Sequence, residues 1–168
     1  MKLTLTMVRM SFDVFLQKFS AGESGQVNRE PILALLRTIT TDHANNFGFY
    51  ALKFPDGGHV EFSAEGLESS EELTAFAFHF HGGMSPDAVQ FMFDIAKTGD
   101  LVVLAAMKPF VPILFWPEQR KNLPTELACN DPEPILCGSP KELRALLAGG
   151  YAGWQKYRDQ VIRQSRES

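Results

Sequence analysis

The stretch Leu73-Thr74-Ala75-Phe76-Ala77-Phe78-His79-Phe80-His81 alternates between two kinds of side chain almost without exception. Successive side chains of a β-strand point to opposite faces of its sheet, so this alternation predicts a strand. We expect Phe76, Phe78 and Phe80 to enter the hydrophobic core from one face. The opposite face, which carries His79 and His81, is where we look for function.

A β-hairpin is predicted just before this strand. Residues 47–54 and 59–64 are rich in aromatic and aliphatic side chains, and the turn Pro55-Asp56-Gly57-Gly58 separates them. Proline, aspartate and glycine at such a break are typical of a tight connection between antiparallel strands. We therefore expect the two strands and residues 73–81 to be antiparallel neighbours in one sheet.

The register between these strands decides which polar side chains meet on the outer face. Aligning the buried side chains of the last two strands places His59 opposite His79. The same alignment in the hairpin places Lys53 opposite Glu61. Polar groups then gather at one end of the face and small apolar groups at the other. The candidate binding residues on this face are Lys53, His59, Glu61, His79 and His81.

These candidates include the imidazole and carboxylate groups that bind zinc, and opposed Cβ atoms on neighbouring strands lie about 5 Å apart. Histidines on a sheet face are more often solvated or hydrogen-bonded, however, so we predict no tightly held metal. The sequence also lacks a glycine-rich phosphate loop, a nucleophile elbow, a His-Glu-x-x-His motif and a paired-cysteine motif. We therefore predict no catalytic residue and no cofactor.

Helical periodicity, caps and breakers predict the remaining elements. Residues 31–39 and 86–97 predict helices over the phenylalanine face, each with a capping residue and a proline at its start. Further elements are expected at 10–19 and 101–107 (strands), 111–116 (an edge strand), 117–134 (irregular), 135–137 (a strand), 141–148 (a helix stopped by Gly149-Gly150) and from Tyr151 onward (a terminal helix).

The order of these elements predicts the fold class. Successive strands joined by short turns favour an α+β fold, with a mainly antiparallel sheet and helices packed on one face in two layers. Residues 10–168 are expected to form this single domain. Residues 1–9 are expected to be an N-terminal extension that can lie outside its core.

The terminal helix has an aromatic stripe. Its residues Trp154, Tyr157 and Val161 recur at spacings of three and four, which places them on one face of a helix. An exposed aromatic pair is unfavourable in a monomer, so either the body of the domain or a dimer partner is expected to cover it. Trp154 and Tyr157 are therefore further candidate binding residues, and the chain is expected to be a monomer or a homodimer.

The run Asp-Val-Phe-Leu-Gln at residues 13–17, followed by Gly22-Glu23, resembles the opening of an uncharacterised family of small bacterial proteins. The resemblance covers the first strand and, loosely, the order of strands and helices. It implies no activity, and no functional residue is transferred from it.

Composition limits the partners. The 168 residues include 16 basic and 20 acidic side chains, and the net charge of −4 gives no general attraction for nucleic acid or an anionic membrane. The apolar run at residues 101–107 is too short to cross a bilayer, and no signal peptide precedes it, so a cytoplasmic location is expected. Four glutamates within residues 65–72 have no neighbouring base and predict a solvated loop, or else a docking surface for a basic partner.

Three hypotheses for the function remain open. The first is a non-enzymatic protein that binds another protein, as the immunity and antidote proteins of bacterial toxin systems do; it leads because catalytic motifs are missing. The second is a metal-dependent or histidine-based enzyme that uses the histidine face. The third is a small-ligand binder whose pocket is roofed by the proline-rich residues 117–134.

Overall fold

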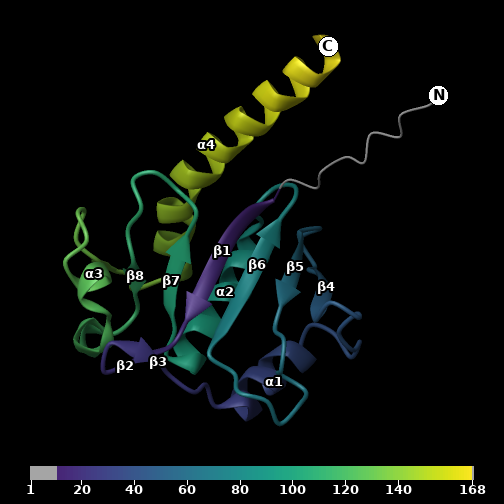
Figure 1. The fold of residues 1–168 in the computed structure, drawn as a ribbon. Helices are drawn as coiled ribbons and strands as arrows, with labels where there is room; N and C mark the ends of the chain where they lie inside the picture. The colour runs from purple at the N-terminus through teal and green to yellow at the C-terminus, as the bar shows by residue number, and fades with distance from the viewer. Residues whose placement is uncertain (1–10, 168) are drawn as a thin grey trace.

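The computed structural model describes residues 11–167, with the backbone alone at Tyr151, Gly153, Trp154, Tyr157 and Arg158. A seven-stranded sheet has the order β4-β5-β6-β1-β7-β8-β9, and helices pack against it (Figure 1). Every pair of neighbouring strands is antiparallel except β8 and β9. The predicted α+β class with a mainly antiparallel sheet is confirmed.

The main sheet consists of β1 (Phe12–Gln17), β4 (Phe49–Lys53), β5 (His59–Ser63), β6 (Ala75–Phe80), β7 (Val102–Ala105), β8 (Ile113–Leu114) and β9 (Ile135–Leu136). A separate small hairpin consists of β2 (Phe19–Ser20) and β3 (Glu23–Ser24). The helices are α1 (Arg29–Arg37), α2 (Pro86–Gly99), the short 3-10 helix η1 (Pro117–Asn122), α3 (Thr125–Ala128) and α4 (Pro140–Glu167).

The phenylalanine face of β6 forms the centre of the core, as the alternation predicts. Phe76, Phe78 and Phe80 are all buried. Phe91 of α2 contacts both Phe78 and Phe62 of β5 edge to face, with ring centroids 6.0 and 5.8 Å apart. Burial of each phenylalanine ring stabilises the fold by about 1.5–3 kcal/mol relative to exposure.

Local signals set the bounds of α2. The Ser85 hydroxyl accepts a hydrogen bond from the Ala88 N–H at 3.2 Å, and Pro86 occupies the first helical position. The helix was expected to stop at Gly99, but Asp100 takes the left-handed conformation that ends it, with φ of 55°. Gly99 serves packing instead, because a Cβ there would lie 3.0 Å from the Leu101 side chain.

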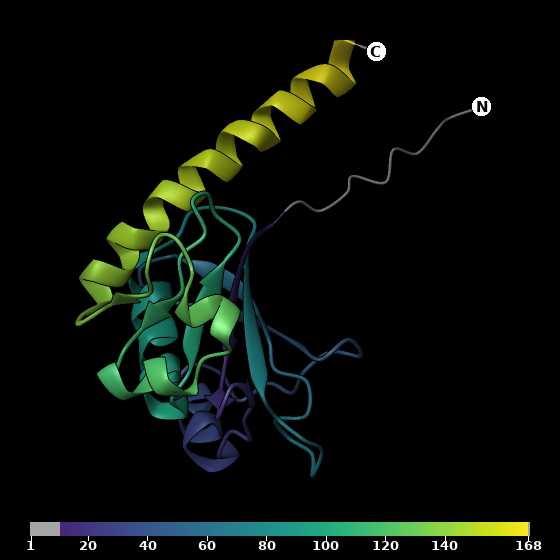
Figure 2. The ribbon, with the colours of Figure 1, turned by 60° about the vertical axis from the view of Figure 1, so that its left-hand side comes forward.

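The predicted break at Gly149-Gly150 is wrong, because α4 is one continuous helix of 28 residues. Leu143 and Leu147 are fully buried in its first half, and the second half extends beyond the rest of the domain (Figure 2). A Cβ at Gly150 would lie 2.4 Å from the Cβ of Met107. Gly150 therefore allows the helix to pass close to the loop after β7, and this contact outweighs the low helix propensity of glycine.

The predicted edge strand at 111–116 is also corrected. Its regular part is β8, and β9 pairs with it in parallel, so β9 is the edge. Pro112 has no N–H, but its carbonyl accepts a hydrogen bond from the Ile135 N–H at 2.9 Å. Proline thus takes part in this pairing through its acceptor alone.

Among residues 11–167, the segments that pack on the outer face of the sheet lie at one end of it. Phe19, Val102, Leu114 and Leu123 form a second buried cluster where η1 and α3 lie over β7 and β8. Figure 1 looks onto this face, with α3 beside β8 and with β1 and β6 in front of α2. The predicted two-layer arrangement therefore applies to the β4–β5–β6–β1 end, and the proline-rich segment adds a third layer at the other end.

Candidate functional site

The outer side chains of β4, β5, β6 and β1 form a surface that we call the open face. One cross-strand row on it is mainly apolar: Phe49, Ser63, Ala77 and Phe15 are successive partners. The next row is mainly polar: Ala51, Glu61, His79 and Asp13 are successive partners. Polar and apolar groups are therefore segregated on the face, in adjacent rows.

The predicted register is wrong by two residues in both strand pairs. Glu61 lies opposite His79, and His59 lies opposite Lys53. The hairpin fixes the second pairing, because the Phe54 N–H donates to the Gly58 carbonyl at 2.9 Å. A shift of two residues keeps every side chain on its own face, so the alternation of buried and polar residues could not distinguish the two registers.

His79 is anchored by a carboxylate from β1. Its Nδ1 lies 2.7 Å from Oδ1 of Asp13, and the two side chains are 19% and 33% exposed. An ionised carboxylate only accepts hydrogen bonds, so Nδ1 of the imidazole donates in this contact. The Ser11 hydroxyl donates to the same carboxylate oxygen, and the edge of the Phe49 ring contacts the imidazole with centroids 5.5 Å apart.

The other predicted residues surround this pair. Nε2 of His81 lies 3.4 Å from Oε1 of Glu61, so a second imidazole also has a carboxylate beside it. His59 and Lys53 are exposed at the end of the hairpin. The expectation that His59 and His79 lie side by side is wrong. His79 lies beside Asp13, and His81 lies beside Glu61. Among residues 11–167, no three histidine, cysteine, aspartate or glutamate side chains are placed to hold a metal ion.

The two candidates on the terminal helix lie apart from the open face. The side chains of Trp154 and Tyr157 are outside the described residues, and the helix backbone at these positions belongs to the projecting half of α4 (Figure 2).

Sequence reasoning missed Asp13 and Phe15 as members of the site. Both alternate with the buried residues Phe12, Val14 and Leu16 of β1, so their outward direction was readable. Their neighbours were not readable, because β1 pairs with a strand that begins about 60 residues later. Knowledge that β1 lies in the middle of the sheet, beside β6, would have identified both residues as members of the site.

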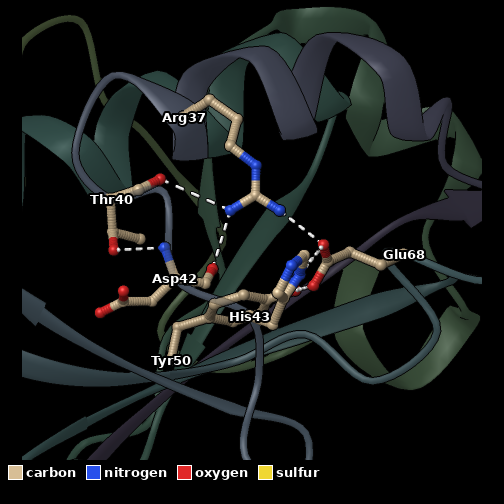
Figure 3. Close-up of polar contacts among 6 residues, drawn as sticks. All are labelled: Arg37, Thr40, Asp42, His43, Tyr50 and Glu68. Atoms are coloured by element: carbon tan, nitrogen blue, oxygen red, sulfur yellow. Dashed lines mark hydrogen bonds and ion pairs between the residues drawn. The ribbon is translucent and has the colours of Figure 1, made fainter.

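A second polar cluster lies at the end of α1, and we call it the Glu68 cluster (Figure 3). The Glu68 carboxylate accepts hydrogen bonds from Arg37 at 2.5 Å, from the Tyr50 hydroxyl at 2.5 Å and from Nδ1 of His43 at 2.9 Å. Arg37 also donates to the Asp42 carbonyl at 2.8 Å. The cluster joins α1, β4 and the loop at 65–72.

The pKa shifts in the Glu68 cluster indicate a structural role. Burial, followed by the hydrogen bond to Glu68, raises the pKa of Tyr50 well above its ordinary value of 10.0. The hydrogen bond from Tyr50 is the main cause that lowers the pKa of Glu68. Tyr50 therefore stays protonated and Glu68 stays ionised at neutral pH, so neither group is suited to exchange protons there.

The acidic loop is less solvated than its sequence indicates. No base lies near it in the chain, but α1 supplies two: Arg37 pairs with Glu68, and Arg29 donates to the carbonyls of Gly66, at 2.6 Å, and Glu71. The prediction of a simple solvated loop is corrected for Glu68, whose carboxylate is engaged on both oxygens. This loop is held in place by side chains from a distant part of the chain.

Comparisons with known proteins give no match: no protein-family model fits the chain, and neither a curated protein nor a solved structure matches it. The resemblance of residues 13–17 to an uncharacterised bacterial family stays a prediction. Within residues 11–167, no helix combines the length and the apolar character needed to cross a membrane.

Proposed function

We propose that this protein is a non-enzymatic binding protein that recognises another protein through the open face. The observation that carries this proposal is Phe15: it projects from a central strand of the sheet and is 45% exposed. A contiguous exposed apolar patch bordered by polar groups marks an interaction site, and Phe15 is the most exposed side chain of the apolar row on this face.

The surroundings of Phe15 support this function. Its row continues through Ala77 and Ser63 to Phe49, which gives a flat strip of small and aromatic side chains across four strands. The adjacent row supplies hydrogen-bonding groups at Asp13, His79 and Glu61. An apolar centre with a polar border is the usual composition of a protein–protein interface.

The charge of the chain indicates the chemistry of the partner. Residues 11–139, which include the whole sheet, contain 17 acidic and 8 basic side chains. Such an excess attracts a basic surface and repels nucleic acid. A basic protein is therefore the proposed partner, and an immunity or antidote role is the kind of function that fits, by analogy of class.

A histidine-based enzyme is the second candidate, and the contact between His79 and Asp13 favours it. A carboxylate at 2.7 Å from Nδ1 orients an imidazole so that Nε2 can accept a proton. This arrangement serves equally to hold His79 as a fixed hydrogen-bonding group in an interface. The two candidates differ in their response to His79→Gln, which would abolish catalysis but weaken binding only in part.

Capture of the partner tests the first proposal. The full chain is expressed in its source organism with an affinity tag that contains no histidine. Proteins that co-purify with it are quantified by mass spectrometry. We expect one basic protein in near-stoichiometric amount, and a loss of at least about tenfold with Phe15→Ser because the change removes the apolar centre.

Phe110→Ser is the matched control, because Phe110 is also exposed, at 36%, but lies in the loop after β7. It should retain the partner, and thermal unfolding of both variants should show that they are folded. The proposal fails if no basic protein is captured, or if the two variants lose the same protein equally.

A further inference from the structure

A groove lies on the helical side of the molecule, where the turn before α2 meets the first half of α4. It is lined by Met84, Lys141, Arg144, Ala145 and Ala148, and the hollow has a volume of about 560 Å³. The helices α1, α2 and the first half of α4 pack on the core face of the sheet, so this α4 groove and the open face belong to opposite sides of the domain (Figure 1). It is therefore distinct from the site of the proposed function.

We propose that the α4 groove binds an acidic, amphipathic helix of a partner protein. Met84, which is mostly buried, forms the apolar floor of the groove, and methionine is a side chain that adjusts easily to different apolar surfaces. Ala145 and Ala148 are exposed and small, which leaves room for side chains of a helix lying along α4.

Two cations at the groove favour an acidic occupant. Lys141 and Arg144 are exposed, and neither forms an ion pair or a hydrogen bond with any described side chain. The nearby acid Glu142 forms no ion pair with either cation among the described residues; its Oε2 accepts the Gly138 N–H at 2.8 Å at the start of the helix. Their charge is thus directed to the groove and the solvent.

The position of Lys141 is unfavourable for α4 itself. Ser139 caps the helix by accepting the Glu142 N–H at 3.1 Å, and Pro140 follows, so Lys141 lies in the first turn. The N-terminal end of a helix carries a partial positive charge that disfavours a cation there. A charged residue that destabilises its own helix and has no stabilising partner in the fold is expected at a functional site.

The distribution of charge makes this surface specific for acid. Residues 140–150, which carry the groove, contain 2 basic residues and 1 acidic residue, whereas residues 11–139 contain 8 basic and 17 acidic. An acidic helix is therefore attracted to α4 and repelled by the rest of the domain, which fixes where it can dock. The open face and the α4 groove would then select partners of opposite charge.

Binding of two synthetic peptides to the full chain tests the proposal. The first is a fluorescein-labelled helical peptide with glutamate on one face and leucine and alanine on the other; the second has lysine in place of each glutamate. Fluorescence anisotropy at physiological salt should show saturable binding of the glutamate peptide alone. The double variant Lys141→Glu/Arg144→Glu should weaken it by at least about tenfold, because the rim then repels the ligand.

Two further variants separate the groove from general charge attraction. Arg163→Glu/Arg166→Glu changes the net charge equally but lies in the projecting half of α4, and it should alter binding by less than about twofold. Ala148→Leu leaves the charge unchanged but fills the groove, and it should weaken binding by about tenfold. Thermal unfolding should show no loss of stability with Lys141→Glu, because an acid suits the first turn of a helix.

The proposal is overturned if the glutamate peptide does not bind, if the lysine peptide binds equally, or if the two double variants weaken binding by the same factor. It is also overturned if anionic phospholipid vesicles bind the chain through Lys141 and Arg144 while the glutamate peptide does not. These outcomes do not bear on the proposed function of the open face, because that function is tested with Phe15 and a basic partner.

Discussion

The two halves of the outer sheet face have different side chains and different cover. At the β7–β8 end the outward residues Val102 and Leu114 are aliphatic, and η1 and α3 bury them with Leu123. At the β4–β5–β6–β1 end the outward residues are mostly alanine, serine, histidine and carboxylates, which gain little from burial. Phe15 and Phe49 are the aromatic exceptions, and the exposure of Phe15 is the reason to expect a partner on this half.

The largest expected effect contrasts one apolar side chain from each half. Leu123→Ala should lower the free energy of unfolding by about 2–4 kcal/mol, because Leu123 is buried between η1 and the sheet. Phe15→Ala should lower it by less than about 1 kcal/mol, because the ring already contacts water. Urea unfolding measures both, and equal losses would show that the open face is covered within the chain.

The same contrast between covered and free positions applies to adjacent glycines of α4. Gly150→Ala should destabilise the fold by about 1–3 kcal/mol, because its Cβ would lie 2.4 Å from the Cβ of Met107. Among the described residues, apart from its chain neighbours and the helix backbone, none has an atom within 4 Å of a Cβ added at Gly149, so Gly149→Ala should stabilise the helix by about 0.5–1 kcal/mol. Chemical denaturation of the two variants should therefore give changes of opposite sign.

The Glu68 cluster contains a carboxylate that accepts hydrogen bonds from three side chains of distant parts of the chain. Glu68→Gln should lower the free energy of unfolding by about 1–2 kcal/mol at neutral pH, because it weakens the hydrogen bonds to Tyr50 and Arg37. The pKa of Glu68 is lower in the folded state than its ordinary value of 4.5, so the carboxylate stabilises the fold above that pH.

This contribution is lost as the pH falls through the folded-state pKa. The difference in stability between the wild type and Glu68→Gln should therefore shrink on acidification, as measured by urea unfolding between pH 7 and about pH 3. A difference that stays constant over this range would contradict the lowered pKa of Glu68.

Tyr50 gives the smallest effect, which is spectroscopic. Its pKa is raised from 10.0, so its contribution to stability is complete below that pH and is lost only as the pH rises further. At about pH 10.5 the folded wild type and Tyr50→Phe should show the same tyrosinate absorbance. The wild type should show the larger absorbance once both proteins are unfolded in urea at that pH.

Sequence alternation predicts the faces of the sheet but not its register or its strand order. It assigns Phe76, Phe78 and Phe80 to the core, because burial on one face is a local property of the strand. It cannot place β1 beside β6, since that pairing joins distant segments, and it cannot distinguish registers that differ by two residues. Asp13 was missed for the first reason, and the wrong pairing of His59 with His79 arose from the second.

The helical elements show the same limit. The start of α2 was predicted from Ser85 and Pro86, which act within one turn. The continuity of α4 through Gly149 and Gly150 was not, because the contact with Met107 comes from another part of the chain. Tertiary contacts override helix propensity at such positions.

Oxidative footprinting of the open face tests the central claim most directly. The full chain is exposed to hydroxyl radicals alone and with the basic protein that it captures, and the oxidation rate of each side chain is read by mass spectrometry. The account predicts that the partner lowers the rates at Phe15 and Phe49 at least about fivefold and leaves Phe110 unchanged, because interface centres exclude water. Unchanged oxidation of Phe15 in the saturated complex would contradict it.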